Sequence, residues 1–185
     1  MKMALSTIIV LTILVYPFGV YFGIQYFSPM FFACILILVT LARFCLLTNE
    51  KTLSAQLIFA LTVLYSGSIY LFDSENLLLL YPAFISLIMC MLFGASLGQK
   101  HTMIERMAIT GGTSITPNIT KYTWRLTAIW SGILLVNTCL SVYFAFYSSR
   151  EAWAVYTGFV CYVIFGGIFL VEYVYRQYFI SKYGP

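Results

Sequence analysis

Six ionisable or phenolic side chains lie near the ends of long apolar runs, where a charged group could be bound. They are Glu105, Arg106, Tyr122, Arg125, Glu172 and Arg176. Arginine holds carboxylate or phosphate oxygens through paired hydrogen bonds, so this set predicts a polar site for an anionic head group. The competing interpretation is that Glu172 and Arg176, four residues apart, pair along one helix while the arginine side chains snorkel to water.

A second set of polar residues falls on or beside one face of a predicted helix. The set comprises Thr127, Ser131, Asn137, Thr138 and Ser141. Such a stripe predicts either the polar lining of a cavity or a packing face, because small hydroxyl residues let a neighbouring helix approach and hydrogen-bond to it. The packing interpretation describes the more frequent use of these residues.

Catalytic and metal-binding patterns are weak in this sequence. His101 is the only histidine, and a general base needs a positioned partner. Metalloprotease, nucleophile-elbow and P-loop motifs are missing, and the five cysteines lie in or beside apolar runs without CxxC spacing. We therefore expect no catalytic residue, no metal and no cofactor. A small acyl- or glycosyl-transfer enzyme that uses Glu105 or His101 stays an alternative.

The composition of the 185-residue chain indicates a membrane protein. Hydrophobic residues make up 62% of it and charged residues only 9%, whereas a soluble domain carries about a quarter charged residues. The net charge of +4 comes from basic residues scattered between apolar runs. No cluster of four or more lysines and arginines occurs, so neither a nucleic-acid partner nor a polybasic lipid patch is expected.

Six apolar runs are each about long enough to cross a bilayer as a helix. They lie near residues 4–23, 28–47, 53–72, 77–97, 123–148 and 152–178. The runs are continuous rather than alternating, which argues against a transmembrane barrel. The sequence therefore predicts an all-α, polytopic membrane helix bundle in which residues 1–185 form a single transmembrane domain.

The basic residues predict the orientation of this bundle. Nine of the ten fall at the same side of the predicted spans: Lys2, Arg43, Lys51, Lys100, Arg106, Lys121, Arg125, Arg176 and Lys182. Arg150 alone falls at the other side, together with the acidic turn that holds Asp73 and Glu75. Since loops rich in lysine and arginine stay in the cytoplasm, we expect both termini to be cytoplasmic.

The longest connection between predicted spans, residues 99–121, has its own pattern. Met103, Ile104, Met107 and Ala108 share one helical face, which predicts a short amphipathic helix lying on the membrane surface. A short soluble turn is the competing interpretation.

Several stretches resemble those of a known family. They read YPFGVYFGIQYF at 16–27, LLYP at 79–82, MIERM at 103–107, YTWRLTAIW at 122–130 and EYVYR at 172–176, with Asn137 and Trp153. All of these except EYVYR resemble, in their layout, the intracellular septation protein A (YciB) family of bacterial inner membranes. IERMA at 104–108, YTWRLTAIW and EYVYR look closer still to those of a sister group of membrane proteins that accompany gene clusters for aryl polyene pigments.

The resemblance implies a multi-pass protein of the bacterial inner membrane with a role in envelope biogenesis. We expect a non-enzymatic protein that supports lipid-linked synthesis through contacts with membrane lipids and with other membrane proteins. The first alternative is a carrier or flippase-like transporter of an amphiphile, whose path the stripe in the fifth span would line. The transferase described above is the second alternative.

Overall fold

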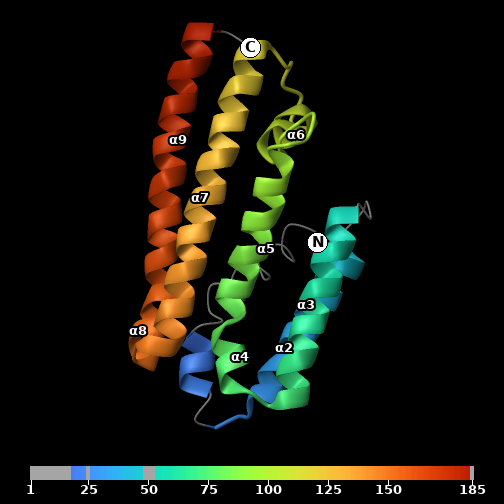
Figure 1. Cartoon of the computed structure of the whole chain (residues 1–185), viewed down its shortest axis with the longest axis vertical. Coiled ribbons are helices and arrows are strands. Elements are labelled where there is room, and N and C mark those ends of the chain that lie inside the picture. Colours follow the sequence, from blue (N-terminus) through green and yellow to red (C-terminus); the bar gives the residue numbers. More distant parts are fainter. Residues whose placement is uncertain (1–17, 24–25, 48–52, 184–185) are drawn as a thin grey trace. The chain divides into compact units, whose positions relative to one another are not determined.

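The chain folds as α-helices joined by short connections (Figure 1). The computed structural model describes residues 18–23, 26–47 and 53–183, and no strand occurs among them. The all-helical prediction is therefore confirmed for this part of the chain. Most of the predicted first span, residues 4–17, lies outside the described residues.

The helices follow the predicted apolar runs closely. After a helical stretch at 18–23 they are α2 (Pro29–Leu47), α3 (Leu53–Phe72), α4 (Glu75–Leu79), α5 (Tyr81–Ser96), α6 (Met103–Thr110), α7 (Pro117–Tyr147), α8 (Arg150–Val155), the π-helical turn η1 (Tyr156–Val160) and α9 (Cys161–Tyr183). The short helix predicted between the fourth and fifth spans is present as α6.

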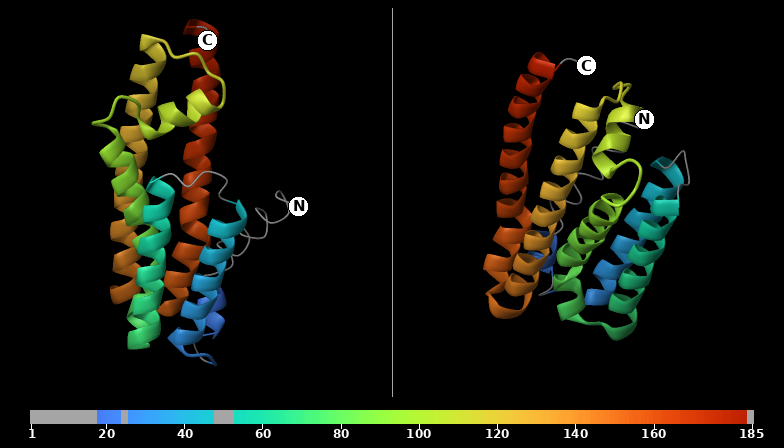
Figure 2. Two further views of the ribbon diagram at one scale, coloured as in Figure 1. Left: turned by 90° about the vertical axis from the view of Figure 1, so that its right-hand side faces the viewer. Right: turned by 45° about the horizontal axis from the view of Figure 1, so that its top comes forward.

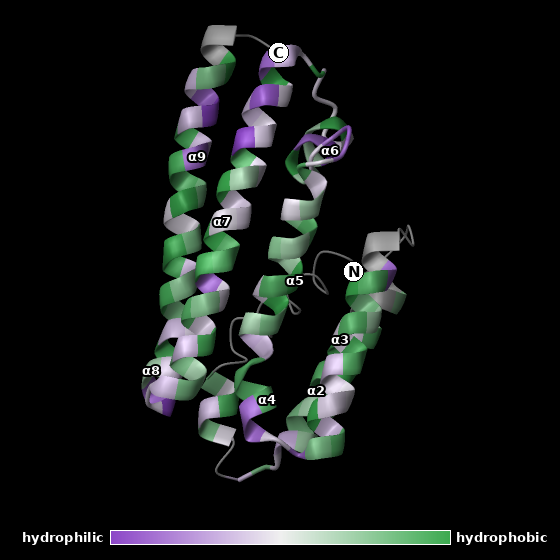
Figure 3. Ribbon diagram, in the orientation of Figure 1, coloured by the Kyte–Doolittle hydropathy of each residue, from purple (hydrophilic) through white to green (hydrophobic). Residues whose placement is uncertain are grey.

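Among the residues that the structure describes, two helical runs are long and apolar enough to cross a membrane (Figure 3). They are Pro117–Tyr147 and Arg150–Ile180, the second of which joins α8, η1 and most of α9. Only 17% and 22% of their most apolar windows are buried within the protein. The apolar portions of α2, α3 and α5 are shorter, so the six-span arrangement stays a prediction.

The predicted fourth span, residues 77–97, is broken into α4 and α5 at Leu80. Pro82 explains the break, because proline has no N–H to donate to the carbonyl four residues earlier and its ring crowds that carbonyl. Proline is tolerated in the first turn of a helix. A new helix can therefore start at Tyr81.

The structure begins α7 at Pro117, ahead of the predicted start at residue 123. The Thr116 hydroxyl accepts a hydrogen bond from the Ile119 N–H at 3.4 Å, and proline suits the first helical turn. The sequence prediction placed the start of this helix too far along the chain, because the first residues of α7 are polar. The earlier start matters, since it places Asn118 and Lys121 on a helical face.

The described residues fall into two compact units. Of these residues, unit 1 contains those from 18 to 85 together with Leu140–Val160, and unit 2 contains Ser86–Cys139 and those from 161 to 183. In unit 1, α2 and α3 lie side by side (Figure 1, Figure 2).

The core of unit 1 is built around Trp153, whose side chain is 1% exposed. Its indole Nε1 donates to the Leu79 carbonyl at 3.0 Å. The Tyr65 hydroxyl donates to the Leu77 carbonyl at 2.8 Å, and the Tyr65 ring stacks on Phe84. These two bonds satisfy carbonyls at the end of α4, where the helix itself leaves them without partners.

Arg150, Glu75 and Asp73, three charged residues in the described part of unit 1, are held by other groups of the same unit. Arg150 forms an ion pair with Glu75. Asp73 accepts a hydrogen bond from the Met30 N–H at 3.0 Å, and so caps the first turn of α2. Polar contacts between loops and helix ends thus fix these connections.

Candidate functional site

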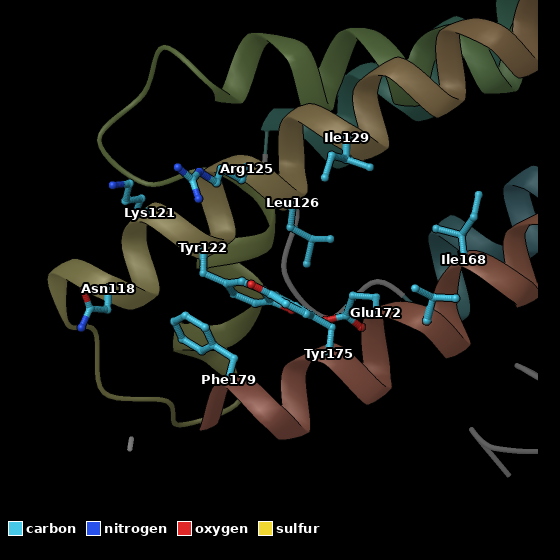
Figure 4. A pocket seen from close by; sticks show the side chains of 11 residues that line it. Asn118, Lys121, Tyr122, Arg125, Leu126, Ile129, Ile168, Glu172, Tyr175 and Phe179 are labelled. Carbon is cyan, nitrogen blue, oxygen red and sulfur yellow. The ribbon is translucent and has the colours of Figure 1, made fainter. Parts of the chain in front are cut away.

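A pocket of about 560 Å³ lies between α7 and α9 within unit 2 (Figure 4). Its lining residues come from the first half of α7 and the second half of α9: Asn118, Lys121, Tyr122, Arg125, Leu126, Ile129, Ile168, Val171, Glu172, Tyr175 and Phe179. Pockets that bind small molecules have volumes in the same range, about 300 to 1,000 Å³. The pocket is therefore large enough for a ligand.

The α7 side of the pocket carries two cations without internal partners. Lys121 and Arg125 are exposed, and neither makes a hydrogen bond or ion pair with any residue in the described part of the chain. Four residues apart, they lie on one face of the helix, and Figure 4 shows both side chains at one end of the pocket. Their charges are available to an external anion.

The one carboxylate in the lining is already engaged. The Glu172 side chain is 10% exposed, and its Oε1 accepts a hydrogen bond from the Tyr122 hydroxyl at 2.8 Å. Arg176 Nε lies 3.7 Å from the same oxygen, and its guanidinium also lies 5.5 Å from the centre of the Tyr173 ring. Glu172 is thus compensated by Arg176, and the charge left over at the pocket is positive.

Aromatic rings close one part of the pocket. The Tyr122 ring stacks against Phe179 with centroids 4.7 Å apart and against Tyr175 at 6.0 Å. These contacts join α7 to α9 and fix Tyr122, so that its hydroxyl reaches Glu172. Offset ring pairs of this kind add to the stability that burial alone provides.

The remaining wall of the pocket is aliphatic. It is formed by Leu126, Ile129, Ile168 and Val171. Figure 4 shows Leu126, Ile129 and Ile168 on the side away from Lys121. The pocket therefore joins a cationic end to an apolar end, which is the arrangement an anionic amphiphile requires.

The structure brings together four of the six residues predicted for the anion site. Tyr122, Arg125 and Glu172 line the pocket, and Arg176 contacts Glu172. The pairing of Glu172 with Arg176 matches the competing interpretation for those two residues, whereas Arg125 has no such partner.

Glu105 and Arg106 lie apart from the pocket, on α6. Glu105 is 1% exposed, and its carboxylate accepts bonds from the Thr120 hydroxyl at 2.7 Å and from the Thr102 N–H at 3.3 Å. His101 Nδ1 lies 3.4 Å from the same carboxylate. Arg106 donates through Nε to the His101 carbonyl at 3.0 Å. Glu105 therefore attaches α6 to the start of α7 and does not face the pocket.

The sequence prediction missed four lining residues that carry polar or aromatic groups. They are Asn118, Lys121, Tyr175 and Phe179. A usable signal was present, because Asn118, Lys121 and Arg125 repeat at three and four positions, as do Glu172, Tyr175 and Phe179. The late start assigned to α7 hid the first of these patterns.

None of the five residues of the polar stripe lines the pocket, and two of them, Ser131 and Asn137, contact α5. Ser131 Oγ donates to the Cys90 carbonyl at 3.3 Å, and Asn137 Nδ2 donates to Ser86 Oγ at 3.1 Å. Thr127 and Thr138 bond carbonyls of their own helix at 2.7 and 2.8 Å. In unit 1, the remaining member, Ser141, is 1% exposed. The contacts of Ser131 and Asn137 are those of a packing face.

Among the described residues, no group of three or more histidine, cysteine, aspartate or glutamate side chains is placed to hold a metal ion. Comparisons of the chain with models of protein families, with curated proteins and with solved structures find no match. The geometry of the pocket is therefore the main guide to what the protein binds.

Proposed function

We propose that this chain is a multi-pass, non-enzymatic protein of the bacterial inner membrane that binds an anionic amphiphile between α7 and α9. The binding would serve envelope biogenesis or lipid-linked synthesis, through contacts with lipids and with other membrane proteins. One observation carries the proposal: the same pocket joins Lys121 and Arg125, two cations that make no hydrogen bond or ion pair with any described residue, to an aliphatic wall.

The surroundings of the long helices support a membrane location. A core helix of a soluble protein has its apolar residues covered, but the most apolar windows of α7 and of α8 to α9 are only 17% and 22% buried. Large apolar side chains such as Leu135, Val136 and Leu170 are more than half exposed. Contiguous exposed apolar surface of this extent is costly in water and is stable in lipid.

The length of α7 supports a position of the cations near lipid head groups. Its 31 residues correspond to about 46 Å, whereas the hydrocarbon layer is about 30 Å thick. The first turns of α7, which carry Lys121 and Arg125, would therefore reach the interfacial layer. Basic residues near helix ends favour the cytoplasmic side, in line with the predicted orientation.

The proposed role in envelope synthesis depends on the motif resemblance. The stretches MIERM, YTWRLTAIW and EYVYR, which resemble those of the membrane proteins that accompany aryl polyene gene clusters, supply Glu105, Arg106, Tyr122, Arg125, Glu172 and Arg176. Three of these six residues, Tyr122, Arg125 and Glu172, line the pocket. The resemblance and the pocket thus share three residues.

A carrier of the same amphiphile is the second candidate, because a carrier would also need a binding pocket such as the one in unit 2. Reconstituted liposomes with a fluorescent anionic lipid distinguish the two. A binding protein leaves the lipid in its original leaflet, whereas a carrier makes the lipid of the inner leaflet accessible to an external quencher.

The binding proposal is tested by lipid retained on the purified protein. Ile168→Trp fills the aliphatic wall, whereas Ile164→Trp places the same side chain one helical turn away, at a residue that does not line the pocket. We expect anionic lipid, measured by native mass spectrometry, to be lost in Ile168→Trp and kept in Ile164→Trp. Equal retention by both variants would contradict a site between α7 and α9.

A further inference from the structure

We infer that the head group held by Lys121 and Arg125 is a phosphate monoester carried on a lipid tail. This inference depends on the proposed function, because it names the class of amphiphile that the α7–α9 pocket takes. It is drawn from the number, type and position of the charges at the pocket.

The charge balance of the pocket favours a dianion. Glu172 is compensated by Arg176 and receives the Tyr122 hydroxyl, so Lys121 and Arg125 leave two positive charges. A phosphate monoester carries about −1.5 to −2 near neutral pH, its second pKa being about 6. A phosphodiester or a carboxylate carries a single negative charge and would leave one cation unmatched.

The positions of the donors also suit phosphate. Arg125 offers a planar fork that holds two oxygens, and Lys121, one helical turn away, offers a separate point charge. Asn118 lies on the same side of α7 and lines the pocket as well. A carboxylate has two oxygens, which the arginine alone would satisfy, whereas a phosphate monoester presents three terminal oxygens to all three side chains.

The start of α7 adds a further positive potential. Helix N-termini expose backbone N–H groups and favour anions within the first turns. Lys121 lies in the second turn of α7, and Asn118 directly follows Pro117. This contribution strengthens a site already formed by the two cations and the pocket.

The aliphatic wall distinguishes a lipid from free phosphate. Ile129 lies one helical turn beyond Arg125 on α7, and Ile168 lies one turn before Glu172 on α9. A free phosphate would contact only the cationic end and leave these residues uncovered. Burying a tail there adds about 25 cal/mol for each Å² of apolar area, so the tail contributes directly to affinity.

Titration of the detergent-solubilised protein, followed by native mass spectrometry, tests the inference with four probes that carry oleoyl chains, two in each phospholipid and one in the fatty acid. The probes are dioleoyl phosphatidic acid (monoester), dioleoyl phosphatidylglycerol (diester), oleic acid (carboxylate) and dioleoyl phosphatidylcholine (no net charge). A competition series with inorganic phosphate provides a fifth arm. We expect phosphatidic acid to bind most tightly and inorganic phosphate to compete only weakly.

Variants identify the side chains responsible. We expect Lys121→Gln and Arg125→Gln each to weaken phosphatidic acid binding by about 10- to 100-fold, the range for a hydrogen bond to a charged group. Arg125→Lys keeps the charge without the fork, and we expect an intermediate loss. Lys100→Gln, which removes an exposed lysine that does not line the pocket, should bind as the unaltered protein does. Circular dichroism and size-exclusion elution show whether each variant folds.

The outcomes separate the inference from the proposed function. If phosphatidylglycerol or oleic acid binds as tightly as phosphatidic acid, the assignment of a monoester head group is wrong, but the proposed amphiphile site is not contradicted. If inorganic phosphate competes as strongly as the lipid, the tail does not contribute to binding and the assignment of a lipid ligand is wrong. If no anionic lipid binds better than phosphatidylcholine, and folded Lys121→Gln binds like Lys100→Gln, the proposed function itself fails.

Discussion

Arg150 in unit 1 and Arg125 in unit 2 are both exposed arginines near helix ends, but their surroundings differ. Arg150 forms an ion pair with Glu75, and the neighbouring Glu151 receives a hydrogen bond from Tyr21. Arg125 has no such partner within the described residues, and it lines a pocket that has an aliphatic wall. The first arrangement joins helix ends, whereas the second leaves a charge for a ligand.

This difference shows how charged residues that hold the fold together can be distinguished from those that bind a ligand, in a chain with few charges. In the described part of both units the carboxylates are engaged: for example, Asp73 caps α2, and Glu172 accepts the Tyr122 hydroxyl. A cation beside a pocket that has no partner among the described residues is therefore a candidate binding residue, because it can still form an ion pair with an external anion. The following predictions test this contrast, in order of decreasing expected effect.

The largest effect should follow from removing both free cations. Lys121→Gln with Arg125→Gln should weaken binding of an anionic lipid by about 100-fold or more, because two charge-assisted contacts are lost. Binding isotherms in detergent micelles measure this. A loss below about threefold in a folded double variant would mean that these residues do not bind the head group.

A substitution at Trp153 tests whether the core of unit 1 contributes to stability without affecting the pocket in unit 2. Trp153→Phe removes the bond to the Leu79 carbonyl and leaves that buried carbonyl without its donor, at a cost of about 1–3 kcal/mol. We expect a lower thermal unfolding midpoint with unchanged lipid affinity. A large loss of lipid affinity in the folded variant would show that the core of unit 1 and the pocket are not independent.

The pH dependence of binding sharpens the assignment of the head group. A phosphate monoester gains its second negative charge as the pH rises through its second pKa of about 6. Affinity for phosphatidic acid should therefore rise several-fold between pH 5 and pH 8. Affinity for phosphatidylglycerol, which has no proton to lose in this range, should stay constant. Parallel curves for the two lipids would argue against the monoester.

Glu172→Gln should act in the direction opposite to the loss of Lys121 or Arg125. The amide oxygen can still accept the Tyr122 hydroxyl, but Arg176 loses its ionic partner and the pocket becomes more positive. We expect anionic lipid to bind about two- to fivefold more tightly. The effect is small because the charge removed belongs to a partly exposed ion pair, and such pairs contribute little free energy. Weaker binding would indicate that Glu172 mainly holds the pocket in shape.

The smallest effect is expected at Arg150. Arg150→Gln breaks an exposed ion pair with Glu75, and such pairs contribute about 0–1 kcal/mol. The unfolding midpoint should fall slightly, and lipid affinity should not change. A loss of lipid binding equal to that of Arg125→Gln would remove the distinction between the two arginines.

Local features of the helices could be predicted from the sequence. The bounds of α3, Leu53–Phe72, agree with the predicted run 53–72, and α6 lies where the amphipathic pattern placed it. Both signals are local, since a continuous apolar run and the spacing of Met103, Ile104, Met107 and Ala108 on one helical face act within a few turns.

The composition of the site could be predicted only in part, because it depends on which helix faces meet. Six residues near the same predicted boundary were grouped together, but Glu105 turns toward Thr120 while Glu172 turns toward Tyr122. The capping box of Thr102 and Glu105 is a local signal that the grouping overlooked, whereas no local pattern indicates that Glu172 accepts the Tyr122 hydroxyl from another helix. The π-helical turn η1 was also not predicted, because the composition of Tyr156–Val160 fits an ordinary helix equally well.

The most direct test of the account is photo-crosslinking with a phosphatidic acid analogue that carries a diazirine in its acyl chain. After illumination of the detergent-solubilised protein, peptide mass spectrometry locates the label. We expect labelling concentrated at residues 126–129 and 168–171, and strongly reduced in the Lys121→Gln, Arg125→Gln double variant. Label spread evenly over exposed faces of α2, α3 and α9, and unchanged in that variant, would contradict a lipid site between α7 and α9.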